Sequence, residues 1–290
     1  MRSLRFILAL AIVTALAPLS QAASRVDCTA LKSTILNRSV PYCVMLPPSY
    51  DQDKTRRYPV LYYLHGLGDN EQSLVNGGGW NLYEDLLAQN KVGEYIIVTP
   101  NGFRSFYINS KDGKFLYEDF FIKEFLPAIE RKYRVRVGRG GRGIMGVSMG
   151  GYGAFHYAFK YPQKFISVSG HMSALRETPP PSLDGTPDAR LLGVVFGTPF
   201  DPSYYKNNSP FTLVRNAPLA ALKGMSIYFD AGSNDDYNFD AGAEALHKLL
   251  VQRGVKHEFH IYPGGHSWAF MAEHFGASLE LHSRAFGLTK

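Results

Sequence analysis

The sequence predicts an α/β fold, a single domain with a mostly parallel central sheet and helices on both faces of it. Two observations lead to this prediction. Several segments are apolar almost without interruption, which is typical of strands buried on both faces of a sheet. These segments alternate with helical patterns along the chain. The 290 residues, 45% of them hydrophobic and 19% charged, are enough for one large domain or two small ones.

Six segments have the composition of strands. The first, residues 39–48, is stopped by two prolines, and the second, residues 59–66, is almost wholly apolar. The others are expected at 95–100, 143–146, 225–230 and 257–262. Helical patterns lie between or after them, at 119–133, 152–161, 241–253 and 267–286.

The segment from about residue 173 to 216 is irregular and rich in proline. It is either an inserted, cap-like region that covers a site or an ordinary long surface loop.

The first 22 residues are expected to be a signal peptide and not part of the fold. Arg2 and Arg5 precede an apolar run at residues 6–16, and the small-residue stretch Ser20-Gln21-Ala22 follows. The apolar run is shorter than a membrane span, so we expect no span after cleavage. Residues 23–290 would then form one exported domain, either periplasmic or extracellular.

Export also bears on the two cysteines, Cys28 and Cys43. In an oxidising compartment a disulfide between them is favoured over two free thiols. Neither has the spacing of a metal ligand, so no metal site is expected. Without Arg2 and Arg5 the formal net charge falls from +6 to +4. That mild excess, with no basic cluster interleaved with aromatics, argues against a nucleic-acid partner.

The pattern Gly146-Val147-Ser148-Met149-Gly150 carries most of the functional information. An apolar segment leads into it and a small-residue helical pattern follows, which is the sequence form of a nucleophile elbow. In such a strained turn between strand and helix, any side chain two positions from the serine would collide with neighbouring backbone. We therefore expect Ser148 to be a nucleophile with an exposed hydroxyl.

A serine nucleophile needs a base, and His266 is the best candidate among nine histidines. It lies in Pro263-Gly264-Gly265-His266-Ser267-Trp268, directly after the last expected strand, where α/β active sites are assembled. His156 and His247 fall inside expected helices, and positions in a strand explain His257 and His260.

The acid that orients the base is one of four aspartates close together, Asp230, Asp235, Asp236 and Asp240. Asp235 is favoured because it lies far enough beyond its strand to reach a histidine on the next loop. The alternative is Asp230, which ends that strand and could instead stabilise the loop by accepting backbone N–H bonds.

Backbone donors are also expected, to stabilise the oxyanion of an acyl-transfer reaction. One is the N–H of Met149, the residue after the nucleophile, and the other is the N–H of Leu67 in the loop after an earlier strand. His65 at the start of that loop is expected to shape it and not to act as a base.

Three aromatic residues, Trp80, Tyr107 and Trp268, are candidates for substrate contacts by stacking, with core packing as the alternative for each. The 173–216 segment and the loop around Gly77-Gly78-Gly79-Trp80 are expected to set the acyl and alcohol specificity.

The chain resembles the esterase family that includes esterase D-type S-formylglutathione hydrolases, feruloyl and acetylxylan esterases, and the mycolyltransferases. The resemblance covers nearly the whole exported part and includes Leu64-His65-Gly66-Leu67-Gly68, Pro100-Asn101-Gly102, Gly146-Val147-Ser148-Met149-Gly150-Gly151, Gly232-Ser233-Asn234-Asp235 and Gly265-His266-Ser267-Trp268. It implies the α/β-hydrolase fold and no cofactor. It also implies Ser148 as nucleophile, Asp235 as acid, His266 as base, and backbone donors at Leu67 and Met149.

The sequence therefore predicts an exported serine esterase that hydrolyses carboxylic esters of feruloyl, acetyl or other acyl type through an acyl-enzyme. The ester would be a small molecule or would be linked to a polysaccharide. One alternative is an acyltransferase that moves the acyl group to a sugar hydroxyl, because the same residues serve both reactions. The other is a non-catalytic carbohydrate-binding module that has kept the fold.

Overall fold

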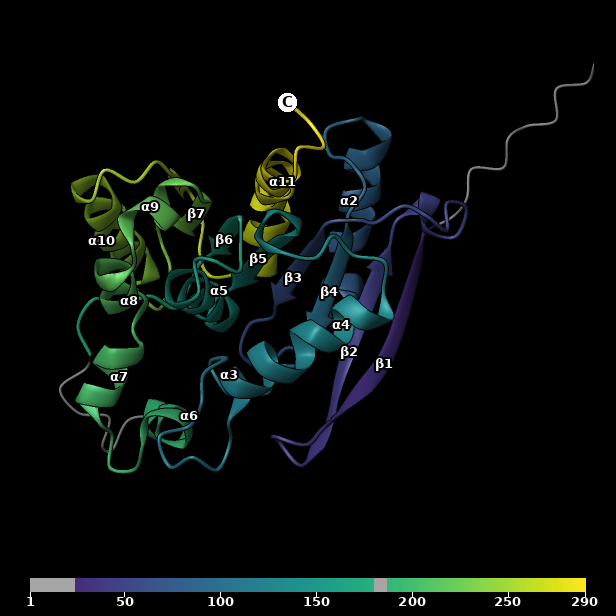
Figure 1. Ribbon diagram of the computed structural model, residues 1–290. Coiled ribbons are helices and arrows are strands. Elements are labelled where there is room, and N and C mark those ends of the chain that lie inside the picture. Colours follow the sequence, from purple (N-terminus) through teal and green to yellow (C-terminus); the bar gives the residue numbers. More distant parts are fainter. Residues whose placement is uncertain (1–23, 180–186) are drawn as a thin grey trace, which may run out of the picture.

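The computed structural model describes residues 24–179 and 187–290, so the expected signal peptide at 1–22 lies outside the described residues. An eight-stranded sheet has the order β1-β2-β4-β3-β5-β6-β7-β8 (Figure 1). Strands β3 to β8 are parallel, and β1 and β2 are antiparallel at one edge. The predicted fold class is confirmed. The strands are β1 Arg25–Ser33, β2 Arg38–Leu46, β3 Val60–Leu64, β4 Ile96–Pro100, β5 Arg142–Val147, β6 Ser167–His171, β7 Ser226–Gly232 and β8 Glu258–Tyr262.

Two of these strands, β1 and β6, have no counterpart in the sequence prediction. β1 is an edge strand. Six of its nine residues are polar or small and are not buried, so it carries no continuous apolar signal. β6 is fully buried but has the sequence Ser-Val-Ser-Gly-His, and its polar side chains find partners only in the tertiary structure.

Successive residues of the central strands face two separate apolar layers, because side chains alternate along a strand. In β3, Tyr62 and Leu64 face the larger layer, whereas Leu61 and Tyr63 face the smaller one. Helix α5 (Met149–Lys160) packs in the larger layer with α4 (Leu126–Lys132) and α10 (Phe239–Gln252). Helices α2 (Gly79–Ala88) and α11 (Trp268–Ala285) pack side by side in the smaller layer (Figure 1).

The other helical segments are short. They are α1 (Ser73–Asn76), α3 (Tyr117–Asp119), a π-helical segment (Phe120–Phe125) and α9 (Leu219–Lys223), with single 3-10 turns at Pro48–Tyr50 and Arg139–Gly141. The expected helix at 119–133 is thus α3, the π-helical segment and α4 in succession. The helix expected at 152–161 begins three residues earlier, at Met149, directly after Ser148.

From residue 187 on, the segment 173–216 is helical and not irregular, which corrects the prediction for that part. It contains α6 (Pro187–Phe196), α7 (Pro202–Asn208) and α8 (Pro210–Asn216). Asp201 caps α7 by accepting from the N–H groups of Ser203 and Tyr204. In both α7 and α8 the proline occupies the first turn, where its missing N–H costs nothing. These prolines begin helices and do not interrupt them.

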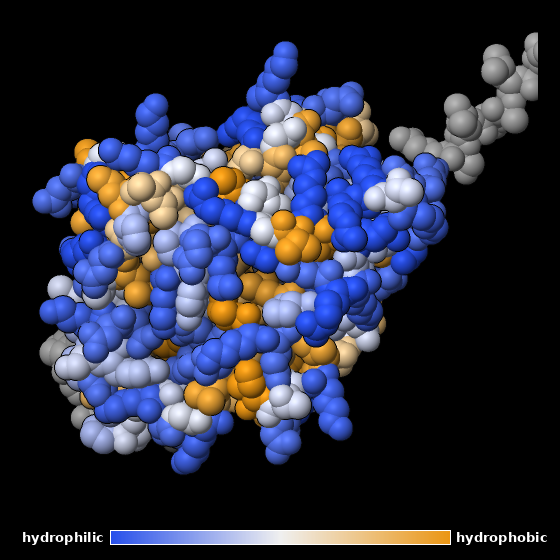
Figure 2. All heavy atoms as spheres, viewed as in Figure 1, coloured by the Kyte–Doolittle hydropathy of each residue, from blue (hydrophilic) through white to orange (hydrophobic). Residues whose placement is uncertain are grey.

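On the face drawn in Figure 2, hydrophilic side chains cover most of the surface, and apolar residues are visible between them. Across the residues that the structure describes, no helix has the length and apolar character needed to cross a membrane.

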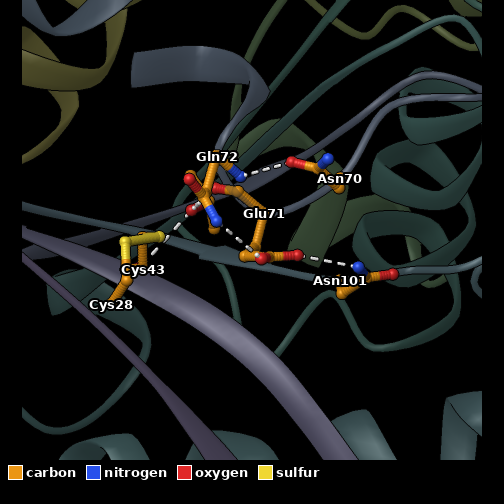
Figure 3. Close-up of a disulfide and its surroundings, with 7 residues drawn as sticks. Cys28, Cys43, Asn70, Glu71, Gln72 and Asn101 are labelled. Atoms are coloured by element: carbon orange, nitrogen blue, oxygen red, sulfur yellow. Dashed lines mark hydrogen bonds between the residues drawn. A yellow bond between two sulfur atoms is a disulfide. The ribbon is translucent and has the colours of Figure 1, made fainter. Parts of the chain in front are cut away.

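The predicted disulfide between Cys28 and Cys43 is confirmed (Figure 3). The two cysteines face each other on β1 and β2, with a Cα–Cα distance of 4.1 Å. The hydroxyl of Thr99 on β4 donates to the backbone oxygen of Glu71, at 2.6 Å, and the Glu71 carboxylate accepts from Asn101 Nδ2, at 2.7 Å. The disulfide therefore joins the edge strand β1 to β2. β2 in turn pairs with β4, whose Thr99 holds the loop after β3.

We expect the double substitution Cys28→Ser, Cys43→Ser to lower the free energy of unfolding by about 3 kcal/mol, because the cross-link closes a loop of 15 residues in the unfolded chain. Urea unfolding followed by circular dichroism measures the change. Reduction of the wild-type protein should reproduce it. An unchanged unfolding midpoint in both cases would contradict the expectation.

Candidate active site

Ser148 lies between β5 and α5 in a strained backbone conformation, with φ 54° and ψ −116°. A positive φ is costly for a residue with a side chain and persists only where the surroundings enforce it. The Ser148 N–H donates to the carbonyl of His171, at 3.0 Å, and its carbonyl accepts from the N–H of Ala174, at 2.9 Å. The end of β6 thus holds the turn.

The glycines on either side of Ser148 leave the space that the turn needs. A Cβ on Gly146 would lie 2.2 Å from the backbone of Gly150, and one on Gly150 would lie 1.9 Å from the carbonyl oxygen of Leu64. Both contacts are with backbone, which cannot move aside as the end of a side chain could. The steric argument made from the sequence therefore holds at both positions.

His266 lies on the loop after β8 with its ring between Ser148 and Asp235. Its Nε2 is 3.0 Å from Ser148 Oγ, and its Nδ1 is 2.8 Å from Asp235 Oδ2. A carboxylate can only accept, so Nδ1 carries the hydrogen and Nε2 is left to accept the serine proton. The three residues form a continuous chain of hydrogen bonds.

Asp235 is buried, with 6% of its surface exposed. Burial raises the pKa of its carboxyl, but the hydrogen bonds from His266 and from the N–H of Tyr237, at 2.8 Å, outweigh that effect. Its pKa therefore lies below the usual value, and the group is a carboxylate at neutral pH.

Asp230, the alternative acid, has a different place. Its carboxylate accepts from His171 Nδ1, at 2.9 Å, and from the Tyr228 hydroxyl, at 2.8 Å, deep beneath the sheet end. Within residues 24–179 and 187–290, no backbone N–H donates to it as this alternative expects, because its carboxylate is taken up by buried side chains. Asp236 is exposed on the loop.

Two further histidines contact serines but cannot serve a substrate. His171 Nε2 is 2.7 Å from Ser278 Oγ, and His282 lies between Ser167 and Ser169, at 2.7 and 2.9 Å. All of these residues are fully buried. Burial, together with the nearby His171, lowers the pKa of His282 to about 3, so that ring is neutral. These are hydrogen-bonded core residues.

The loop after β3 places Leu67 at the edge of the site. The N–H of Asp69 donates to the carbonyl of Gly66, at 3.2 Å, and Gly68 has φ +89°, as the third position of a type II turn requires. Among the described residues no acceptor takes up the Leu67 N–H. Met149 is the first residue of α5, where an N–H has no partner within the helix.

His65 holds this loop and is not available as a base. Its Nε2 accepts from the N–H of Gly102, at 2.8 Å, so its Nδ1 carries the hydrogen and donates to the carbonyl of Gly66, at 2.7 Å. Burial lowers its pKa, which keeps the ring neutral. The role expected from the sequence agrees with these contacts.

A cavity of about 160 Å³ adjoins Ser148 and His266. Trp268 lines it and is 40% exposed. Trp80 and Tyr107 do not line it: Trp80 packs against Tyr83 in the smaller apolar layer, and Tyr107 is fully buried with its hydroxyl on the His65 carbonyl. The substrate-contact prediction is therefore corrected for these two rings, which are packing residues. The remaining lining residues are Gly66, Leu67, Asp69, Val147, Met172, Ser267 and Met271.

The described part of 173–216 contributes no residue to this cavity. Nor do the described residues include a group of three or more histidine, cysteine or acidic side chains placed to hold a metal ion.

Sequence reasoning did not single out Tyr237, whose ring lies beside that of His266. It is 53% exposed, and its ring centroid lies 4.9 Å from that of His266 in an edge-on arrangement. Arg176 donates to its carbonyl, at 3.1 Å. The available signal was an aromatic residue two positions after the acid.

Comparisons with known proteins found similarity to esterases. The family model described as "Putative esterase" matches residues 33–282. An esterase of Mycobacterium tuberculosis is 31% identical over 248 residues, 77% of this chain and 51% of that protein, so the chain spans about half the length of this relative. An endo-1,4-beta-xylanase/feruloyl esterase of Xylanibacter ruminicola is 33% identical over 129 residues, 42% of this chain and 18% of that protein. The solved structure of a ferulic acid esterase has a TM-score of 0.77 and 30% identity, covering 90% of this chain and 98% of that one.

We expect Gly150→Ala to destabilise the protein by about 3 kcal/mol or more, because its Cβ would overlap the Leu64 carbonyl. The matched control is Gly140→Ala, where a Cβ meets nothing within 4 Å. Thermal unfolding of both variants measures the difference. Equal melting temperatures would contradict the steric account of the turn.

Proposed function

Because this chain belongs to the esterase family, we propose that it is a serine carboxylic ester hydrolase acting through Ser148, His266 and Asp235. The observation that carries the proposal is the unbroken chain of contacts from Asp235 Oδ2 to His266, at 2.8 Å, and from His266 to Ser148 Oγ, at 3.0 Å. Ser148 and His266 also line a cavity that a substrate can enter. This combination meets the geometric requirements for an activated serine.

In the first step, Ser148 Oγ attacks the ester carbonyl carbon while His266 Nε2 removes its proton. Asp235 keeps the imidazole in the required tautomer and stabilises the positive charge that forms on it. The carbonyl oxygen becomes an oxyanion, and the N–H groups of Leu67 and Met149 are the proposed donors to it. Loss of one such donor typically costs about 10²–10³ in rate.

The tetrahedral intermediate then collapses. The bond from carbon to the alcohol oxygen breaks, and His266 gives its proton to the departing alcohol, which leaves the acyl group on Ser148. In the second step His266 takes a proton from water, the hydroxide attacks the acyl carbon, and Ser148 Oγ leaves with the proton from His266. The free acid is released and the enzyme returns to its starting state.

For the substrate we propose esters of feruloyl, acetyl or related acyl groups. Support comes from the relatives named feruloyl or ferulic acid esterase, one of which matches nearly its whole length. The exposed indole of Trp268 in the cavity wall can stack on an aromatic or sugar ring.

We also propose that the chain is exported and works in the periplasm or outside the cell, with residues 23–290 as its catalytic domain. The disulfide between Cys28 and Cys43 supports this, because disulfides persist in oxidising compartments. The arrangement of charged, apolar and small residues at 1–22 is that of a signal peptide.

We expect Ser148→Ala to lower kcat for an activated ester by on the order of 10⁴-fold or more. A fluorophosphonate should add one phosphonyl group to the wild-type protein, seen by intact mass, and none to this variant. Ser203→Ala, an exposed serine of α7, is the matched control and should label like the wild type. Labelling of Ser148→Ala to the same extent would refute the assignment of the nucleophile.

The products should be free acid and alcohol, whether or not a sugar is added as acyl acceptor, because water is the proposed acceptor. Mass spectrometry of reactions on methyl ferulate and acetylated xylan tests this. Acylated sugar as the main product would replace hydrolysis by acyl transfer while leaving the three catalytic residues unchanged.

A further inference from the structure

A second hollow lies next to the Ser148 cavity, between the α1–α2 turn and α11. We call it the α2–α11 groove. It has a volume of about 100 Å³. Its lining includes Leu74 of α1, Leu82 of α2, Ala272 and Phe275 of α11, and the turn Gly77–Gly79. Of the described residues that line it, none is charged, so its occupant would be apolar.

The groove adjoins the catalytic cavity, because the two hollows share lining residues. Trp268 and Met271, three residues apart in the first turn of α11 and so on the same side of the helix, line both hollows. A group attached to a carbonyl at Ser148 would reach the groove by passing these two side chains.

The three glycines of the turn keep the groove open. A Cβ on Gly77 would lie 3.0 Å from Cζ3 of Trp268, and one on Gly79 would lie 2.4 Å from Cδ1 of Leu74. Gly78 has φ +80°, which disfavours any side chain there. Side chains at Gly77 and Gly79 would push against the Trp268 indole and Leu74, which both line the groove. The glycines therefore keep the groove open as well as permit the turn.

We propose that the α2–α11 groove binds the alkyl end of an aliphatic acyl group, so that the enzyme also accepts esters of short to medium fatty acids. This inference rests on the proposed ester hydrolysis. The acyl group stays on Ser148 through both steps, whereas the alcohol must leave before water enters, so a lined groove beside the serine suits the acyl part. At about 100 Å³ the groove is smaller than the cavity of about 150 Å³ that holds one benzene, and it fits an alkyl chain better than an aromatic ring.

The kinetic test compares kcat/KM for p-nitrophenyl acetate, butyrate, hexanoate and octanoate. Each methylene that enters the groove should raise kcat/KM by about fourfold. Ala272→Phe should fill the groove and lower the octanoate-to-acetate ratio of kcat/KM at least tenfold. Ala277→Phe, an exposed alanine of α11 that does not line the groove, is the matched control and should keep the wild-type ratio. A ratio that is equal in the wild type and Ala272→Phe would overturn the proposal.

A binding readout separates this inference from the proposed function. The chain has two tryptophans, and only Trp268 is exposed. Sodium octanoate, but not acetate, should change the tryptophan fluorescence of Ser148→Ala and should have no effect when Ala272→Phe is added. Octanoate binding without any Ser148-dependent hydrolysis in the wild type would refute the proposed function but support the proposal that the groove binds alkyl chains. Hydrolysis with neither octanoate binding nor an effect of chain length on kcat/KM would refute the proposed role of the groove and leave the proposed function standing.

Discussion

At Ser148 the backbone has φ 54° and ψ −116°, and the two strands beside β5, β6 and β3, keep it there. The end of β6 accepts its N–H through the His171 carbonyl, and β3 leaves room for the turn only because position 150 has no side chain. The strain lifts the hydroxyl out of the sheet end toward His266. The proposed base, acid and oxyanion donors all follow the carboxyl ends of strands in the same sheet, which is why they meet at this one serine.

Burial decides what each histidine near the sheet end does. His65 and His282 are fully enclosed, burial lowers their pKa values, and they serve as neutral hydrogen-bonding groups. His171 is equally buried but has a carboxylate, Asp230, against its ring. Only His266 combines a carboxylate partner with access to solvent and to a serine hydroxyl. Four rings of the same chemistry thus have different roles because their surroundings differ.

Helix α11 borders both the proposed catalytic centre and the proposed acyl-binding groove. It starts at Trp268, two residues after His266, with Ser267 accepting from the N–H of Phe270 as its cap. Its first turn supplies walls to both the Ser148 cavity and the α2–α11 groove, and its later turns pack against α2 in the smaller apolar layer. A rigid, well-packed helix therefore fixes the distance between the reacting centre and the groove.

The sequence by itself determined the fold class, the elbow at Ser148 and the loop that carries His266. Apolar runs mark the strands that the hydrophobic effect buries, and glycine spacing marks a turn that has no room for side chains. It also pointed to the Cys28–Cys43 disulfide, which the structure bears out. The tertiary structure alone decided that β1 and β6 join the sheet, that prolines at 202 and 210 begin helices, and that Trp80 and Tyr107 are core residues while Trp268 faces the cavity. An aromatic residue looks the same in sequence whether it packs in the core or contacts a ligand. A polar strand such as β6 looks the same whether it is buried in a sheet or lies at the surface. Its role depends on which distant residues surround it, and only the folded chain brings those together.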